Sequence, residues 1–590
     1  MSHHLTQKVL FCVVDAISLL DDNKHKHKEF LTAMANGGKI LIDCLLALGA
    51  KRGFGIPGES YLAILDALFD KKEDFEFILC RNEGGASFMA SAYGKLMHEP
   101  GLCFVTRGPG AMNAAIGVHT AKQDSSPMIL FVGQIGTQMK GREAFQEIDY
   151  ESAFNDVAKW TVEINDVDRI PEIIARAWFT AISGRPGPVV VALPENILTK
   201  NSSASPLTSA IVVEKTVPSS TSIDKVDRLL TESDFPLIII GGTNWDRSGQ
   251  NALKEFAESS KIPVITAFRY QDQFDNFSPA FCGEAGVGMP SHVRNLIKKS
   301  DLILAINIRF GEMTTDAYSL LDVPVPHQKL IHVHTSEREL GKIYQPDIAI
   351  QANPNEFSIC LSRVLGSWGI WFSNARENYL ASLVAPEQPS DVDMGIVMKY
   401  LQKVLPSDVI ITNGAGNFAV WPNKFFQFGA GSRLLAPQSG AMGYGVPAAI
   451  AAKATFPDRT VVCFAGDGDF QMTCQELATA AQAKIFPIIL IVNNATYGTI
   501  RVHQEKNYPG RVSCTDIVNP DFIGLAQSFG FLGISVKTTD EFFTAFNQAL
   551  NSKNGAVLDL HVSSESLVPS QSLSEIRQKA LNNQTDLICN

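Results

Sequence analysis

From Gly37 onward the chain alternates between short apolar, β-branched runs and longer stretches with the composition of helices. The near-continuous apolarity of the short runs is typical of parallel strands in a sheet that helices cover on both faces. In the first third of the chain we predict strands at residues 54–56, 77–79, 102–106, 129–132 and 189–193. The stretches Glu83–Met97 and Ala111–Lys122 have helix composition and follow glycine-rich or polar entries.

Two polar stretches divide this alternation into three blocks. Residues 200–222 are rich in Ser, Thr and Pro, and residues 384–393 contain Pro and Asp. We predict strands in the second block at residues 237–240, 264–266, 302–306 and 330–334, and in the third at 409–412, 461–464, 488–492 and 557–560. The predicted fold is α/β, with three consecutive doubly wound parallel-sheet domains at 37–200, 215–375 and 390–565. Residues 1–36 form a predicted N-terminal extension with a peripheral helix, and residues 566–590 a C-terminal tail.

Charge and composition exclude several classes of protein. The formal net charge of −11 and the lack of a basic face argue against a nucleic-acid partner. No apolar run reaches the roughly 18 residues that a membrane span needs, and Val9–Leu20 carries Asp15 and no cleavage pattern, so we expect neither membrane insertion nor a signal peptide. Ten scattered cysteines without a CxxC pair suit a reducing compartment, and we expect a cytoplasmic location.

The most informative motif joins Gly466-Asp467-Gly468-Asp469 to Asn493-Asn494. Both segments follow predicted strands, and open α/β sheets bind ligands at the carboxyl ends of their strands. The glycines allow close approach of a diphosphate, and the helix predicted over 475–484 would point its positive end at that anion. Asp467 and Asn494 offer hard oxygen ligands that suit Mg²⁺. A Gly-Asp-Gly alone is more often a turn than a site, so the spacing to the Asn pair decides this interpretation.

The spacing resembles the motif of the thiamine diphosphate-dependent enzymes. Residues 440–445 resemble the family segment that bends the cofactor, with Met442 as the supporting side chain, and residues 81–86 resemble the segment that carries the activating glutamate, here Glu83. The resemblance implies Mg²⁺ ligands at Asp467, Asn494 and the Thr496 carbonyl. It also implies cofactor contacts from Glu83, Pro57, Gly58, Asn417, Gly440, Met442, Gly466, Asp467, Gly468, Asp469, Asn494, Tyr497 and Gly498.

In this family the glutamate bonds N1′ of the aminopyrimidine, and the 4′-nitrogen of the cofactor then takes the C2 proton. For Glu83 the alternative is an ordinary exposed carboxylate at a helix start. Glu83 and Asp467 fall in different blocks, so the cofactor lies between two domains. The resemblance places those domains in different subunits and implies a homodimer or homotetramer with its active site at the subunit interface.

Five segments resemble those of acetolactate synthases, namely 55–58, 107–110, 144–147, 183–188 and 339–342. Within the family the chain is therefore similar to acetolactate synthases, from about Gly37 to Val562. The resemblance makes Phe145 and Gln146 candidates for the active site, although core packing is equally compatible with Phe145. This chain departs from that pattern at four places. Gly311-Glu312-Met313 stands where acetolactate synthases have Asp-Asp-Arg, and His503 stands where they have the substrate-selecting tryptophan. Asn417-Phe418 replaces a Gln-His pair, and His334 and Ser336 replace an Asp pair. The replaced Asp pair weakens the case for FAD, which stays open, and the lost arginine is one that the family associates with substrate and flavin. His503 is either a proton donor or a surface histidine.

We therefore predict decarboxylation of a pyruvate-like 2-oxo acid followed by carboligation, as in branched-chain amino acid biosynthesis. One alternative is a non-oxidative decarboxylase that releases an aldehyde, because residues 494–501 also resemble benzoylformate decarboxylase. A second alternative, from another class, is a catalytically idle protein that binds thiamine diphosphate.

Overall fold

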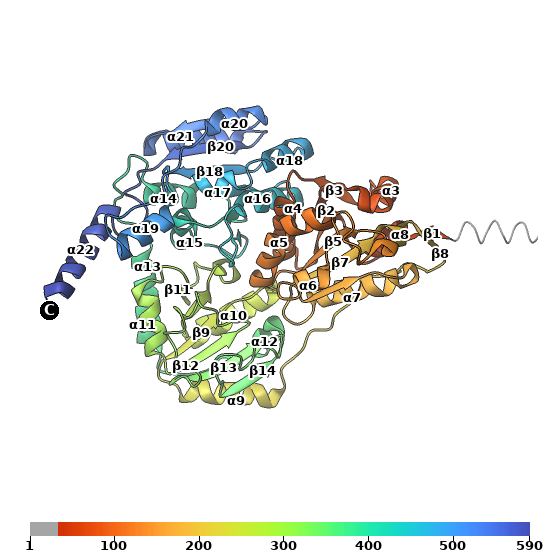
Figure 1. The fold of residues 1–590 in the computed structure, drawn as a ribbon. Coiled ribbons are helices and arrows are strands. Elements are labelled where there is room, and N and C mark those ends of the chain that lie inside the picture. Colours follow the sequence, from red (N-terminus) through yellow and green to blue (C-terminus); the bar gives the residue numbers. More distant parts are fainter. Residues whose placement is uncertain (1–33, 590) are drawn as a thin grey trace, which may run out of the picture.

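The computed structural model describes residues 34–589, so the predicted peripheral helix at residues 1–36 lies almost entirely outside the described residues. Three six-stranded sheets, in each of which the paired strands run parallel, form three domains that meet at a common centre (Figure 1). The predicted fold class is confirmed. The domain boundaries, including the ends of the linkers, stay predictions.

The N-terminal sheet has the strand order β3-β2-β4-β5-β7-β6. Its strands are β2 (Arg52–Gly55), β3 (Glu76–Leu79), β4 (Gly101–Thr106), β5 (Met128–Gln134), β6 (Trp160–Glu163) and β7 (Pro188–Pro194). Its helices are α2 (Gly37–Ala47), α3 (Leu62–Asp70), α4 (Glu83–Met97), α5 (Arg107–Asp124), α6 (Tyr150–Phe154), α7 (Ile170–Ile182) and α8 (Glu195–Thr199). The short strands β1 (Ala35–Asn36) and β8 (Asn201–Ser202) pair antiparallel beside this domain.

The central sheet has the order β11-β10-β9-β12-β13-β14. Its strands are β9 (Pro236–Ile240), β10 (Val264–Ala267), β11 (Phe281–Ala285), β12 (Leu302–Ile306), β13 (Lys329–His334) and β14 (Ile348–Gln351). Its helices are α9 (Ser220–Glu232), α10 (Arg247–Ser260), α11 (Ser291–Lys299), α12 (Pro354–Cys360) and α13 (Gly369–Ser382).

The C-terminal sheet has the order β16-β15-β17-β18-β20-β19. Its strands are β15 (Ile410–Asn413), β16 (Arg433–Leu435), β17 (Val461–Gly466), β18 (Ile488–Asn493), β19 (Leu532–Val536) and β20 (Ala556–His561). Its helices are α14 (Met394–Val404), α15 (Val420–Phe425), α16 (Gly445–Thr455), α17 (Asp467–Gln471), α18 (Glu476–Ala483), α19 (Gly498–Asn507), α20 (Phe522–Ser528), α21 (Thr539–Asn551) and α22 (Leu573–Cys589).

The N- and C-terminal domains share one hydrophobic core cluster where α4 packs on α16. Phe88 of α4 meets Tyr444, which immediately precedes α16, edge to face with ring centroids 5.5 Å apart. Such aromatic pairs add to the free energy of burial. The two domains are therefore packed as one unit within the chain, with the carboxyl edges of their sheets at fixed positions. No helix among residues 34–589 is both long and apolar enough to cross a bilayer.

Candidate functional site

The candidate diphosphate site lies where the strand order of the C-terminal sheet reverses, between β15 and β17. Open α/β sheets bind ligands in the crevice at such a switch point. The loop after β15 carries Asn417, residues 466–469 span the end of β17 and the start of α17, and the turn after β18 carries residues 494–497 before α19 begins at Gly498. Because β15, β17 and β18 are consecutive parallel neighbours, the structure brings these predicted residues to one edge.

Asp467 is buried at the start of α17. Its Oδ1 accepts the N–H of Gly468 at 3.0 Å, and its Oδ2 accepts Nδ2 of Asn519 at 2.8 Å. Burial raises the pKa of Asp467, while the amide of Asn519 and the N–H groups of Gly468 and Ala495 act to lower it. The N–H of Ala495 reaches this carboxylate only because the turn after β18 lies against it. Asp467 and the Asn494 turn are thus neighbours, as the motif spacing predicts.

The turn after β18 is rigidly held. Oδ1 of Asn494 accepts the N–H of Thr496 at 3.0 Å, and the N–H of Tyr497 bonds the Thr515 carbonyl at 2.8 Å. Thr496 is buried, while Tyr497 is partly exposed and Gly498 begins α19. Asn519, which the sequence reasoning missed, also donates to Oδ1 of Asn493 at 2.9 Å and so joins the two half-motifs. An isolated asparagine before a proline gives no sequence signal for that role.

The donor set fits Mg²⁺ bound together with a diphosphate. A carboxylate, an amide oxygen and a backbone carbonyl are hard ligands, and Mg²⁺ completes its shell with water and phosphate oxygens. Within the described residues no group of three or more His, Cys, Asp or Glu side chains could hold a metal ion, so an all-protein cage is absent there. Asp467, Asn494 and Thr496 would hold the ion, and their metal-binding roles stay predictions.

The helix predicted over 475–484 is present as α18 (Glu476–Ala483), with Gln475 and Lys484 as its caps. The sequence reasoning missed the short helix α17, which begins immediately after Gly466. The bonds from Met472 N to Asp469 O and from Thr473 N to Phe470 O tighten the chain between the two helices. The first backbone amides after β17 are therefore those of α17, and the predicted orientation of α18 toward a diphosphate is untested.

Asp469 connects the loops of the C-terminal edge. Its Oδ1 accepts the N–H of Ala415 at 3.0 Å and that of Gly443 at 2.9 Å, and burial raises its pKa to about 7. These bonds fix the loop that carries Gly440 and the half-buried Met442. Asp469 thus acts on the predicted cofactor-bending loop, and a direct cofactor contact from this residue stays a prediction.

Asn417 bridges two other segments of the same edge. Its Nδ2 donates to the Leu567 carbonyl at 2.8 Å, and its Oδ1 accepts the Thr499 hydroxyl at 2.5 Å. His503 lies one turn further along α19 and is exposed. Asn417 and His503 both border a large cavity between the C-terminal and central domains.

The candidate activation site lies at the carboxyl edge of the N-terminal sheet. Glu83 begins α4, and Oδ1 of Asn82 caps the helix by accepting the N–H of Gly84 at 2.8 Å. Oε2 of Glu83 accepts Nδ2 of Asn113 at 2.9 Å. Pro57 and Gly58 follow β2, the strand that pairs with β3 just before Glu83. The carboxylate is thus oriented by a side chain of α5.

Phe145 and Gln146 lie on the loop between β5 and α6. Phe145 is 73% exposed, so it does not pack in the core of the single chain. Gln146 has a φ of 66°, and its carbonyl accepts the N–H of Gly108 at 3.1 Å. Their predicted contact with the reacting end of the cofactor is untested.

Glu476 of the C-terminal domain holds the chain just before Glu83. Its buried carboxylate accepts the N–H of Asn82 at 2.9 Å and that of Arg81 at 3.2 Å. A Cβ on Gly85 would stand 2.5 Å from Oε1 of Glu476, so this close approach requires glycine at position 85. The sequence reasoning did not identify Glu476, because nothing in a helix-start glutamate indicates a partner in another domain.

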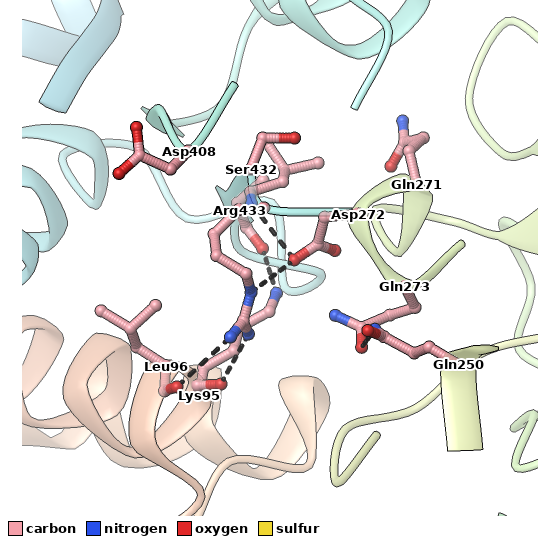
Figure 2. Close-up of polar contacts among 12 residues, drawn as sticks. Lys95, Leu96, Gln250, Gln271, Asp272, Gln273, Asp408, Ser432 and Arg433 are labelled. Carbon is pink, nitrogen blue, oxygen red and sulfur yellow. Dashed lines mark hydrogen bonds and ion pairs between the residues drawn. The ribbon is translucent and has the colours of Figure 1, made fainter. Parts of the chain in front are cut away.

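The other end of α4 is held as well. Figure 2 shows Arg433 of β16 reaching both the central domain and the last turn of α4. Its Nε donates to Asp272 at 3.0 Å, and its Nη atoms donate to the carbonyls of Lys95 and Leu96 at 3.3 and 3.4 Å. The helix that carries Glu83 is therefore fixed at both ends by the C-terminal domain.

Apolar side chains are exposed around each half of the site. Met112 and Ile116 of α5 are each 44% exposed beside Glu83, and on the diphosphate half Met472 and Ile500 are about half exposed. The spacing of Met112, Ile116 and the exposed His119 places all three on one face of α5. Exposed apolar groups clustered beside a polar site are typical of a protein interface.

A cavity of about 1120 Å³ opens beside Asn417, Gly440 and His503. It extends between the C-terminal and central domains and includes Gly311, Glu312 and Met313, the segment at which the chain departs from acetolactate synthases. Glu83, Asp467 and Asn494 lie outside its lining. The cavity thus adjoins the predicted cofactor edge without containing the metal site.

The switch point of the central sheet, between β9 and β12, is tightly packed. Dinucleotides bind at the strand ends near a switch point, here the loops after β9 and β12. Nδ2 of Asn307 donates to the Thr243 carbonyl at 2.7 Å, and a Cβ on Gly242 would stand 2.5 Å from the same Nδ2. About 20 Å³ remains there, enough for one water molecule. The larger cavity also borders the loop after β12, at Arg309 and Phe310, and binding of FAD stays a prediction.

Comparisons with known proteins agree with this geometry. The chain matches three family models, described as the N-terminal TPP binding domain (residues 35–153), the central domain (223–361) and the C-terminal TPP binding domain (414–560) of thiamine pyrophosphate enzymes.

Full-length relatives match as well. The chain is 32% identical to the acetolactate synthase large subunit of Corynebacterium glutamicum, over 87% of this chain and 84% of that protein. It is 31% identical to the mitochondrial acetolactate synthase of Schizosaccharomyces pombe, over 89% and 83%. It is also 29% identical to the large subunit of acetolactate synthase isozyme 2 of Escherichia coli, over 90% and 96%.

Proposed function

Because the chain belongs to the thiamine pyrophosphate enzymes and resembles acetolactate synthases along most of its length, we propose that it decarboxylates a 2-oxo acid and joins the remaining fragment to a second carbonyl compound. The observation that supports the carboligation step is the cavity beside Asn417, Gly440 and His503, which leaves room for a second substrate. A simple decarboxylase needs only a proton at that position.

When bound, thiamine diphosphate supplies the carbon nucleophile and accepts the electron pair that is left as CO₂ departs. Asp467, Asn494 and the Thr496 carbonyl would hold Mg²⁺, and the backbone at the start of α17 would lie near the diphosphate. Glu83 would bond the pyrimidine ring and take part in its proton transfer, and Asn113 orients the carboxylate by donating to Oε2. Met442 would support the bend of the cofactor from its fixed loop.

We infer that the working unit is a homodimer, or a dimer of dimers, in which Glu83 of one subunit completes the diphosphate site of its partner. The exposed apolar residues Met112, Ile116, Met472 and Ile500 beside the two half-sites support this arrangement. A two-fold interface would cover both patches and assemble two equivalent sites. The described cysteines are free, which suits the cytoplasmic location that we expect.

The test is incubation of the purified protein with thiamine diphosphate, Mg²⁺ and pyruvate, followed by separate assays for acetolactate and acetaldehyde. Acetolactate formation supports carboligation, whereas acetaldehyde alone supports the simple decarboxylase. The Glu83→Gln variant, assayed in the same way, gives the background rate of product formation. If wild type and variant are equally inactive with pyruvate and with longer 2-oxo acids, the protein is the idle form and the proposal fails.

A further inference from the structure

The cavity beside the cofactor edge is much larger than two pyruvate molecules need. Its volume of about 1120 Å³ exceeds the range of roughly 300–1,000 Å³ typical of sites for drug-sized ligands. Its far wall is formed by the central domain and its near wall by α15 and α19. A substrate that reacts at the near end therefore has space for a long substituent.

Two cationic side chains on its wall lack an acidic partner. Arg309 and Lys424 are half-buried, and none of the ion pairs within residues 34–589 includes either residue. Arg309 donates to the neutral Gln123 of α5 at 2.9 Å. Burial lowers the pKa of Lys424, and burial together with Arg185 lowers that of Arg309. Partly desolvated cations without a counter-charge are costly unless an anion binds to them.

Nearby acidic residues compensate this positive charge only in part, since Glu339 and Asp124 act to raise the pKa of Arg309 without forming an ion pair with it. Glu339 is paired with Arg185 at 2.9 Å and with Lys342 at 3.6 Å, and Glu312 is exposed. Glu284 accepts the N–H of Arg269 at 2.7 Å, and burial raises its pKa to about 7, so it carries only part of a charge near neutral pH. The wall as a whole is therefore cationic.

Two buried polar atoms on the wall also lack a partner among the described residues. They are Nε of Arg269, whose residue is 5% exposed, and Oε1 of Gln271, whose residue is 2% exposed. Nε2 of Gln271 bonds the Asn423 carbonyl at 3.0 Å, next to Lys424. Figure 2 shows the Gln271 side chain pointing away from the Arg433–Asp272 pair. Neither atom is accessible from the cavity, so Lys424 and Arg309 are the groups that can meet a ligand there.

Between these polar groups the wall is aromatic. Phe268, Phe310 and Phe426 line the cavity between its two ends. Such a lining favours an apolar spacer over a compact polar molecule. The complementary ligand therefore has a reactive end, an apolar middle and an anionic tail.

We propose that one of the two substrates is an extended 2-oxo acid with a second negative charge, and that Lys424 and Arg309 bind that charge inside the cavity. This inference rests on the proposed function, because the reacting end of the substrate must lie at the cofactor edge. The helical segment from Asn417 to Lys424 rises about 10 Å, so the second charge lies several carbons from the reacting carbonyl.

The test uses 2-oxo dicarboxylic acids of five to eight carbons, each paired with the 2-oxo monocarboxylic acid of equal length. Wild-type enzyme loaded with thiamine diphosphate and Mg²⁺ should show a kcat/KM at least about tenfold higher for the best diacid than for its matched monoacid. Lys424→Met should reduce that ratio about tenfold. Lys342→Met is the matched control, because Lys342 lines the same cavity but is paired with Glu339, and it should leave the ratio within about twofold.

A second measurement is independent of turnover. Calorimetry with octanedioate and octanoate, on the same loaded protein, should show tighter binding of the dianion, lost in Lys424→Met. Equal binding of the two acids, an unchanged ratio in Lys424→Met, or purified protein that retains flavin stoichiometrically would overturn the inference. Absence of turnover with every 2-oxo acid, combined with lysine-dependent binding of octanedioate, would support the site and reject the proposed function instead.

Discussion

The N- and C-terminal sheets have the same strand order but carry different chemistry at their carboxyl edges. Numbered within each domain, both run 2-1-3-4-6-5, whereas the central sheet runs 3-2-1-4-5-6. Glu83 follows the second strand of the N-terminal domain, and the Gly440–Gly445 loop follows the second strand of the C-terminal domain. Equivalent positions thus hold a carboxylate in one domain and a cofactor-bending loop in the other.

The difference shows that topology sets where a ligand binds and that side chains set what the site does. The C-terminal edge is a network of fixed loops in which Asp467, Asp469 and Asn519 each bond several segments. The N-terminal edge presents one carboxylate that Asn113 orients. We therefore expect the C-terminal edge to govern the affinity for the cofactor and the N-terminal edge to govern activation of the cofactor.

The largest expected effect is on activation. Glu83→Gln removes the proton that the pyrimidine ring needs and should slow turnover by about 10²- to 10⁴-fold. Exchange of the C2 proton of bound thiamine diphosphate, followed in deuterium oxide, should slow in parallel. Cofactor affinity should change only a few-fold, and a loss of binding that explains the whole defect would remove the distinction between the two edges.

Asp467→Asn should show the opposite pattern. The variant keeps its shape but loses the charge that holds Mg²⁺, so the Mg²⁺ concentration for half-maximal activity should rise about 100-fold. Titration of the chelator-treated protein with Mg²⁺ measures this shift. Turnover at saturating Mg²⁺ should recover in large part, and a defect that no Mg²⁺ concentration relieves would contradict the assignment.

Glu476 connects the two edges, so its loss should moderately reduce both cofactor affinity and the rate of cofactor activation. Glu476→Ala leaves the buried N–H groups of Arg81 and Asn82 without an acceptor and should slow C2-proton exchange about tenfold. Glu476→Gln keeps one acceptor oxygen and should restore part of the rate.

Arg433→Ala is the matched control for Glu476→Ala. It releases the opposite end of α4 and should lower the unfolding temperature without slowing C2-proton exchange more than about twofold. Equal slowing in Arg433→Ala and Glu476→Ala would show that Glu476 has only a structural role.

The smallest effect is expected in the central domain, outside both edges. The folded-state pKa of Glu284, about 7, lies above its ordinary value of 4.5, so its stabilising contribution is complete below pH 4.5 and is lost as pH rises through 7. Glu284→Gln keeps the acceptor for Arg269 and should gain about 2.5 kcal/mol over wild type between pH 5 and pH 8. Urea unfolding at both pH values measures the difference, and equal differences would contradict it.

The sequence predicted the strands that lie inside each sheet, because burial on both faces gives them continuous apolar runs. It also predicted the edge strand β3, but it missed the short pair β1 and β8 and the edge strands β6, β11, β14, β16 and β19. Three of them, β6, β14 and β19, are only partly buried and lack such runs.

The site was predictable only where a motif marks it. The Gly-Asp-Gly and Asn-Asn segments lie on neighbouring strands, as expected. Asn519 and Glu476 act through contacts between distant segments, which local spacing cannot indicate. The orphaned atoms of Arg269 and Gln271 are likewise visible only once the domains are packed together.

The central claim is that Glu83 of one subunit serves the Asp467 site of its partner, and mixing two inactive variants tests it most directly. Glu83→Gln and Asp467→Asn chains, coexpressed in equal amounts and assayed at limiting Mg²⁺, should form hybrid dimers in which one of the two sites is fully wild type. Activity should then return to about one quarter of the wild-type value per chain. If the mixture stays as inactive as either variant alone, although hybrid dimers are shown to form, both residues serve a site within one chain and the account is contradicted.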